Sequence, residues 1–267
     1  MDLRDREWRL VPEERRPGPV TMALEEVAAR RAAEDGVGTV RVYTWPDVLS
    51  LGYRQRADTV DWSFCADTGV DVTRRQTGGG GIYHDSHADV SYGIVAPADD
   101  LPGRLVDSYR ALCEPLLGAL DALGLDADYA DRDLPAVHSP ACYLRSVHPA
   151  HDVLVDGRKV SGNAQYRQRE AVIQHGSLSV EMAVDRHLGV FGCPVSPEHF
   201  RERVTSVRNH ADVDRERVVA ALEDALAAFV GAERRSWTDA ELREARTLAR
   251  EKYDSDAWVR DRRAPAD

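Results

Sequence analysis

Hydrophobic positions recur at helical spacing in four parts of the chain. The first part ends at Gly36 and places Val20, Leu24 and Val27 on one face, which is the pattern of an amphipathic helix. The second part contains Pro115, which would kink a helix or divide it in two. The predicted helices cover residues 20–35, 104–124, 214–230 and 239–253.

Shorter segments alternate apolar and polar residues and predict strands. These segments cover residues 39–45, 48–53, 88–96, 152–155, 158–161 and 171–180. Pro46-Asp47 and Asp156-Gly157 are turn signals, so we expect a hairpin around each. Because no internal repeat or linker interrupts the pattern, we expect residues 1–267 to form a single α+β domain, with helices packed on a mixed, largely antiparallel sheet.

Composition and charge exclude several classes of function. The net charge is −11 and the pI is near 5.3, which argues against a nucleic-acid partner. The sequence lacks a run of 18 apolar residues, and its first ten residues are largely charged. We therefore expect no membrane span, no signal peptide and a cytoplasmic location.

Lysine is rare in this chain. Only two of the 35 basic residues are lysines, Lys159 and Lys252, and the 29 aspartates outnumber the 17 glutamates. An acidic, lysine-poor composition of this kind suggests a salt-adapted, halophilic protein. It also makes Lys159, in the middle of the chain, conspicuous.

The cysteines lie far apart, without the spacing of a zinc site or of a disulfide framework. We expect free thiols, and a buried, inert thiol is the default interpretation for each. The four residues are Cys65, Cys113, Cys142 and Cys193.

A run of four glycines, Gly78 to Gly81, follows Arg74 and Arg75 and is the most distinctive local feature. Glycines are used where the main chain approaches a ligand closely or needs positive φ. The free N–H groups of such a loop, together with the two arginines, would suit a carboxylate or a phosphate. Because no Gly-Lys-Ser/Thr follows, the loop is not a P-loop, and a plain glycine turn stays an alternative.

His84, Asp85, His87 and Asp89 come directly after the loop and raise the question of a metal site. Strand alternation would direct His84 and Asp85 to opposite faces. Because a third ligand at a defined spacing is missing, we expect no metal site here.

A second motif, GRKVSGNAQ, surrounds Lys159. A lysine in a hairpin is usually a solvated surface charge. In a chain that avoids lysine, a compact ammonium also suits a site that stabilises charge on a phosphoryl or acyl oxygen. His175, in the strand IQHGSLS, is either a core histidine or part of a pocket wall, and periodicity does not decide between them.

Together these motifs resemble a known family. RRQTGGGGIYHD is similar to the signature of the lipoate/biotin protein ligase superfamily, and GRKVSGNAQYR and QHGSL match its second and third blocks in order and spacing. TMALEEV, VLSLGYRQ, RERVTSV and AREKYDSDAW are further matches. The resemblance extends from about Trp8 to Trp258.

The resemblance implies an α+β catalytic domain that attaches lipoyl or octanoyl groups to a lysine of lipoyl carrier domains. Such carriers are the E2 components of 2-oxoacid dehydrogenase complexes and the H protein of glycine cleavage. The ligases activate lipoate with ATP and Mg²⁺ to an acyl-adenylate, which the target lysine attacks. The octanoyltransferases use no ATP, and in one branch a cysteine takes octanoate from acyl carrier protein as a thioester.

The resemblance also implies roles for individual residues. Lys159 would contact the activated carbonyl and phosphate oxygens, and His175 would form the opposite wall of the site. Tyr83 and His84 would lie behind the acyl tunnel. The tunnel and the backbone near the reacting atoms would be formed by Arg75, Gly78, Gly79, Gly80, Gly162, Asn163 and Ala164.

Cys142 lies close to where the cysteine octanoyltransferases carry their nucleophile, although its spacing to the lysine motif is slightly longer. As a nucleophile it would need a depressed thiol pKa, assisted by Lys159, His138 or His148. The glycine loop favours the ligases instead, because the octanoyltransferases usually carry arginine at the place of Gly80.

No segment after Tyr253 matches the small C-terminal accessory domain of bacterial ligases, so a ligase would need a separate accessory subunit. We interpret the chain first as a lipoate–protein ligase catalytic domain that uses ATP and Mg²⁺. The first alternative is an octanoyltransferase or amidotransferase that uses octanoyl-acyl carrier protein or octanoyl-H protein, with Cys142 as nucleophile. A non-catalytic acyl-binding regulator, in which Lys159 is replaceable, is an alternative from another class, and a biotin ligase is less favoured.

Overall fold

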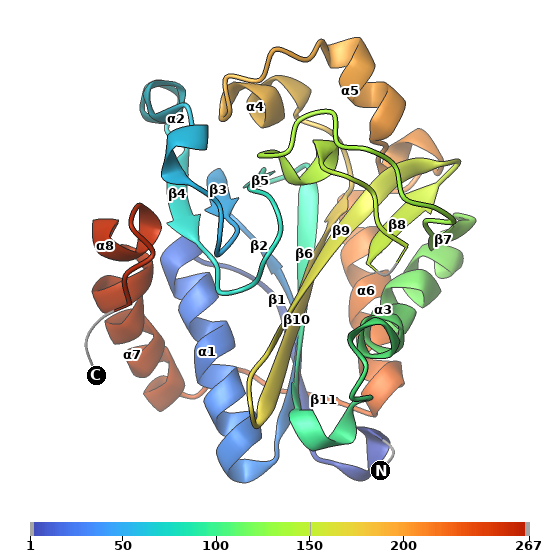
Figure 1. The fold of residues 1–267 in the computed structure, drawn as a ribbon. Helices are drawn as coiled ribbons and strands as arrows, with labels where there is room; N and C mark the ends of the chain where they lie inside the picture. Colours follow the sequence, from blue (N-terminus) through green and yellow to red (C-terminus); the bar gives the residue numbers. More distant parts are fainter. Residues whose placement is uncertain (1–2, 150, 265–267) are drawn as a thin grey trace.

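The computed structural model of the chain describes residues 3–149 and 151–264, which form two β-sheets with helices around them (Figure 1). Within these residues the larger sheet has eight strands. In spatial order they are β11 (Glu233–Arg234), β1 (Trp8–Arg15), β2 (Gly38–Thr44), β6 (Asp89–Pro97), β10 (Ala171–Ser179), β9 (Arg158–Arg167), β8 (Asp152–Val155) and β7 (Ala127–Tyr129). The smaller sheet has the order β4 (Asp71–Arg74), β3 (Val48–Leu51) and β5 (Ile82–His84).

In the larger sheet, β1 pairs in parallel with its two neighbours, and the other pairs in the described chain are antiparallel. The expected α+β class with a mixed, largely antiparallel sheet is therefore confirmed. Helices cover both faces of this sheet (Figure 1). On one face α1 packs on β6 and β10, and α7 packs on α1. On the other face α6 packs on β1 and β2, and α3 packs on α6. The helices are α1 (Gly18–Asp35), α2 (Trp62–Thr68), α3 (Leu105–Ala122), α4 (Val184–Gly189), α5 (Pro197–Arg203), α6 (Arg215–Val230), α7 (Asp239–Leu248) and α8 (Asp256–Val259).

Because both faces of the larger sheet are covered, β6 and β10 are buried along their whole length. These central strands nevertheless carry polar side chains, among them Ser91, His175 and Ser177. A polar group inside a sheet needs a hydrogen-bond partner or a cavity. The middle of the sheet is therefore where a site is to be sought.

Residues 39–45 and 48–53 do not form the expected hairpin. β2 belongs to the larger sheet, whereas β3 pairs with β4 and β5 in the smaller sheet. Trp45, the residue after β2, is buried and donates its indole N–H to Ser91 Oγ at 2.9 Å. This anchor holds the end of β2 against β6, and the chain crosses from one sheet to the other over the next two residues.

The second expected hairpin and the four long helices are confirmed. Asp156 and Gly157 have φ values of 49° and 71° and join β8 to β9 as an antiparallel pair. Pro115 lies inside α3 without dividing it. The pattern of apolar residues missed the parallel strand β1 and the short elements α2, α4 and α5. Over the described parts of the chain, every helix is too short or too polar to cross a bilayer.

Candidate active site

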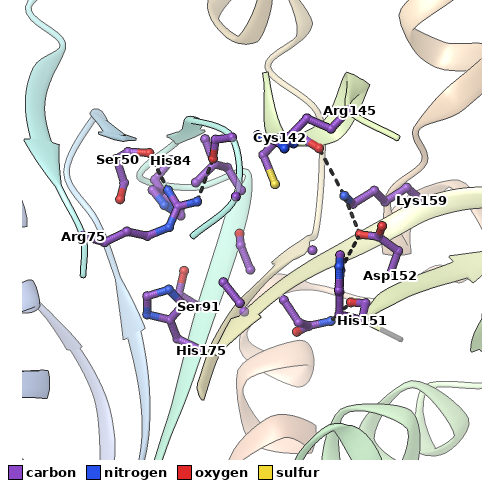
Figure 2. A pocket seen from close by; sticks show the side chains of 18 of the residues that line it. Ser50, Arg75, His84, Ser91, Cys142, Arg145, His151, Asp152, Lys159 and His175 are labelled. Atoms are coloured by element: carbon purple, nitrogen blue, oxygen red, sulfur yellow. Dashed lines mark hydrogen bonds and ion pairs between the residues drawn. The ribbon is translucent and has the colours of Figure 1, made fainter. Parts of the chain in front are cut away.

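A cavity lies between the two sheets (Figure 2). Its walls come from the glycine loop, from residues 142–146 and from β6, β9 and β10. Most of the residues singled out from the sequence line it: Arg75, Gly79, Gly80, His84, Cys142, Lys159, Gly162, Asn163, Ala164 and His175. Motifs about 100 residues apart in the chain therefore meet at one place.

Tyr83 and Gly78 are not among the described residues that line this cavity. Tyr83 is fully buried in the core beneath the smaller sheet, with its ring edge-on to His187. Strand alternation directs Tyr83 away from the cavity and its neighbour His84 toward it. Gly78 contributes a carbonyl that accepts a hydrogen bond from Arg75.

Arg75 shapes the glycine loop from within. Its guanidinium donates to the carbonyls of Ser50, Gly78 and Gly80, each at 2.7 Å, and to Thr77 Oγ1 at 3.0 Å. Burial lowers the pKa of Arg75 from its ordinary value. Because most of its N–H groups already bind the loop, Arg75 positions the main chain more than it offers donors to a ligand.

Arg74 is on the other side of β4 and does not help to form an anion site, which corrects the expectation of two arginines acting together. It donates to the carbonyls of Gly52 and Gln55 at 2.7 Å. It also donates to the carbonyl of Val259, in the last helix, at 2.6 Å. Arg74 therefore ties the C-terminal helix to the turn that follows β3.

The glycine loop is docked on the segment that carries Cys142. Gly81 N–H donates to the carbonyl of Pro140 at 2.8 Å, and Cys142 N–H donates to the carbonyl of Gly81 at 2.7 Å. A Cβ at Gly80 would lie 2.8 Å from the Pro140 oxygen and 3.0 Å from the Cys142 nitrogen. Glycine is required at position 80 because two backbones meet there.

Lys159 enters the cavity from β9, beside a bulge that shifts the β8–β9 register. The side chain is buried, and its Nζ lies 2.6 Å from Asp152 Oδ1 and donates to the Cys142 carbonyl at 3.1 Å. Burial lowers the pKa of Lys159, but nearby negative charge at Cys142 and Asp152 outweighs it and the net shift is upward. Lys159 is therefore a fixed positive charge.

Gly162 brings the Cys142 thiol and the Lys159 ammonium to the same gap. A Cβ at Gly162 would lie 3.1 Å from Cys142 Sγ, 3.2 Å from Lys159 Cε and 3.4 Å from Lys159 Nζ. Any side chain at position 162 would therefore fill the space between the two groups. Cys142 itself is half-buried and lines the cavity (Figure 2).

His175 lies on the wall of the cavity within a buried chain of hydrogen bonds. Its Nε2 is 2.7 Å from Thr77 Oγ1, and its Nδ1 is 2.9 Å from Glu25 Oε2. Glu25 also accepts hydrogen bonds from Arg41 and Tyr43. These hydrogen bonds join α1 and β10 to the glycine loop. His175 is therefore both part of the buried core and part of the cavity wall.

His84 forms the far end of the cavity. Its Nδ1 is 2.7 Å from Asp89 Oδ2, and its ring stacks on Trp45 with centroids 4.3 Å apart. Ser177 donates to the same Asp89 oxygen at 2.6 Å. Burial lowers the pKa of His84 despite the nearby Asp89, which favours a neutral imidazole. Within residues 3–149 and 151–264, no three His, Cys, Asp or Glu side chains gather as metal ligands.

Comparison with known proteins identifies the family of this chain. Residues 17–227 match the model of the lipoyl protein ligase A/B catalytic domain. The chain belongs to this family. The curated relatives of this family member include octanoyltransferase LipM from Symbiobacterium thermophilum, 33% identical, and from Kyrpidia tusciae, 32% identical; each match covers 94% of this chain and 97% of the relative.

Solved structures give the same lipoyl protein ligase A/B fold. A lipoate-protein ligase A bound with ATP superposes with a TM-score of 0.79 at 26% identity, over 95% of this chain and 98% of that one. Protein Ta0514 from T. acidophilum with bound lipoic acid gives 0.78 at 26% identity, over 96% and 99%. The chain is therefore an enzyme of lipoyl or octanoyl transfer with the ligase fold.

Sequence reasoning missed several residues of this lipoyl protein ligase A/B site. Asp152 and Glu25 each hold a cavity side chain through a carboxylate, and so does Asp89, which the sequence suggested only as a candidate metal ligand. Asp152 begins the hairpin strand opposite Gly162, so its cross-strand position could have indicated a partner for Lys159. His138 and His148, expected as helpers of Cys142, do not line the cavity in the described chain, whereas His151 does.

Proposed function

We propose that this enzyme is a cysteine-dependent octanoyltransferase that modifies a lysine of lipoyl carrier domains, such as those of 2-oxoacid dehydrogenase E2 components and the glycine cleavage H protein. The observation that carries the proposal is the shared gap over Gly162, which Cys142 Sγ and Lys159 Nζ both face. The similarity to octanoyltransferase LipM over 94% of the chain supports it.

Cys142 is the cysteine best suited to act as a nucleophile. Burial raises the pKa of Cys65 to about 11 and that of Cys113 to about 12, and it also raises the pKa of Cys193. Cys142 instead is half-buried and lines the cavity, where its sulfur and the Lys159 ammonium face the same gap. A thiolate is the form that attacks a thioester.

The proposed reaction has two steps. The Cys142 thiolate attacks the carbonyl carbon of the octanoyl thioester, an S–C bond forms, and the carrier thiolate leaves and takes up a proton. The amine of the acceptor lysine then attacks the Cys142 thioester, an N–C bond forms, and the Cys142 sulfur leaves. In both steps the Lys159 ammonium stabilises the charge on the acyl oxygen.

The test is intact-protein mass spectrometry after incubation with octanoyl-acyl carrier protein. We expect one added octanoyl group that hydroxylamine removes, and we expect Cys142→Ser to abolish it. Cys193→Ser, a half-buried cysteine that does not line the cavity, is the matched control and should load normally. If wild-type enzyme carries no adduct while it modifies a lipoyl domain, the covalent mechanism is refuted.

A lipoate–protein ligase is the second candidate, favoured by the ATP-bound ligase structure and by glycine at position 80. In this reaction ATP would activate lipoate, and Lys159 would stabilise the acyl-adenylate with Cys142 as a bystander. In the ligase reaction Mg²⁺ would accompany the ATP phosphates. The ligase would be established if lipoate modified a lipoyl domain only when ATP is added, and if Cys142→Ser did not change this activity. The same assay would show whether a separate accessory subunit is needed.

A further inference from the structure

We propose that His151 is the general base that removes a proton from the acceptor lysine. The inference deepens the proposed function, because it concerns the transfer of the acyl group to a protein amine. It holds whether the acyl group is carried by Cys142 or by an adenylate, since the same amine attacks in both reactions.

The reaction requires a base at the cavity. An unperturbed lysine has a pKa near 10.4, so the acceptor arrives as an ammonium that cannot attack a carbonyl. Efficient proton removal needs a base whose protonation changes near the working pH, and imidazole is the side chain that meets this requirement. The candidates are therefore the histidines that line the cavity: His84, His151 and His175.

The buried polar network excludes the other candidates. His84 has one ring nitrogen on Asp89, and His175 has both ring nitrogens engaged, on Thr77 and Glu25. Both lie deep in the cavity, with 4% and 7% exposure of the residue. Among the remaining groups, the upward pKa shift of Lys159 keeps it protonated, and Lys159 holds the pKa of Asp152 well below its usual range despite burial.

His151 has the position that the reaction needs. Its side chain is 32% exposed, so a protein lysine can reach it from solvent, and it lines the same cavity as Cys142 and Lys159 (Figure 2). Its Nδ1 lies 3.7 Å from Asp152 Oδ1, the oxygen that contacts Lys159 Nζ at 2.6 Å. Asp152 therefore connects Lys159, the cation proposed to stabilise the acyl oxygen, to His151, the proposed base.

The imidazole of His151 is also held in place. Its ring stacks on His148, with centroids 5.1 Å apart and planes 8° from parallel, and contacts Tyr109 at 5.4 Å. Its backbone carbonyl accepts a hydrogen bond from Asn163 Nδ2 at 2.8 Å. The side of the ring with Nδ1 faces Asp152, which leaves Nε2 for the incoming amine. This gives Asn163, a motif residue, a positioning role.

The proton balance closes with the groups present. His151 Nε2 takes one proton from the lysine ammonium and releases it to solvent, which leaves a neutral amine. The amine nitrogen then forms its bond to the acyl carbon, the bond from that carbon to Cys142 sulfur breaks, and a second proton passes from the nitrogen to the leaving thiolate. The products are the amide and the free thiol, and His151 is again neutral.

The test compares two nucleophiles on the same isolated octanoyl-enzyme. A lipoyl domain offers a protonated lysine, whereas hydroxylamine is already unprotonated at neutral pH and needs no base. We expect His151→Asn to slow transfer to the lipoyl domain by about 100-fold, the usual contribution of a general base, and to leave release by hydroxylamine unchanged. His199→Asn, an exposed histidine outside the cavity lining, is the control and should transfer at close to the wild-type rate.

Wild-type transfer to the lipoyl domain by His151→Asn would overturn the inference, as would an equal loss with both nucleophiles. Octanoyl loading shows that a variant is folded; if His151→Asn does not load, His151→Gln is tested in the same way, and failure of both would make His151 structural and overturn the inference. If wild-type enzyme does not load, the thioester proposal fails separately, and the same comparison is made with octanoyl-adenylate as donor.

Discussion

The two lysines of this chain have similar partners and different surroundings. Lys159 and Lys252 are both buried, and the nitrogen of each lies close to a carboxylate, at 2.6 Å from Asp152 and 2.7 Å from Glu26. Lys252 is packed against aromatic rings in the helical turn that follows α7, whereas Lys159 faces a cavity and a thiol. The open volume beside the ammonium, rather than the ion pair, distinguishes a chemical site from a structural one.

The largest contrast is expected in activity. Lys159→Ala should lower acyl transfer by more than about 100-fold in a chain that still folds, because it removes a preorganised charge at the acyl oxygen. Lys252→Ala should transfer at the wild-type rate. Both rates are measured with a lipoyl domain as acceptor. Near-normal transfer by Lys159→Ala would remove the distinction between the two lysines and favour a non-catalytic acyl-binding protein.

The Asp152 ion pair should also make stability depend on pH. Its pKa in the folded protein is well below the unfolded value of about 3.9, so its contribution is complete above that pH and is lost as the pH falls through the folded pKa. Asp152→Asn should lower the free energy of unfolding by about 3 kcal/mol at neutral pH, because it leaves Lys159 buried without its partner. Denaturant unfolding from about pH 2 to about pH 7 measures both effects, with the loss of the contribution appearing below about pH 4. A pH profile identical to that of wild type would refute this assignment.

The Lys252 pair should have a smaller effect that is limited to stability. Lys252→Ala is expected to lower the free energy of unfolding by about 1–2 kcal/mol, since it removes a charged hydrogen bond to the partly exposed Glu26. Urea unfolding of the variant and wild type measures the difference. A loss of transfer activity without a loss of stability would show that this lysine, too, contributes to the site.

Salt should have the smallest and least local effect. With a net charge of −11, self-repulsion extends over roughly 10 Å at 0.1 M salt and about 3 Å at 1 M. We therefore propose a salt-adapted protein whose melting temperature rises between low salt and molar KCl, with the same rise in Lys252→Ala. An unchanged melting temperature would contradict this proposal.

Local patterns predicted the parts of this fold that depend on neighbouring residues. Asp156-Gly157 forms its turn, and Lys159 could be singled out by its rarity alone. The failures involve residues whose partners are distant in sequence. Trp45 contacts Ser91 across a strand boundary, which prevented the expected first hairpin. Glu25 contacts His175 from 150 positions away, and periodicity contains no information about such a pair.

The bonds of Arg74 have a consequence for how the protein can be handled. One guanidinium holds the carbonyl of Val259 together with those of Gly52 and Gln55, and Tyr53 N–H in turn donates to Thr77 in the glycine loop. Removal of the last helix would leave the buried Arg74 guanidinium without its carbonyl partner at Val259. The turn that Arg74 holds is itself bonded to the glycine loop of the acyl site. A shortened chain or a bulky fusion at this end would therefore disturb substrate binding before it disturbed the sheet, and an affinity tag belongs at the other terminus.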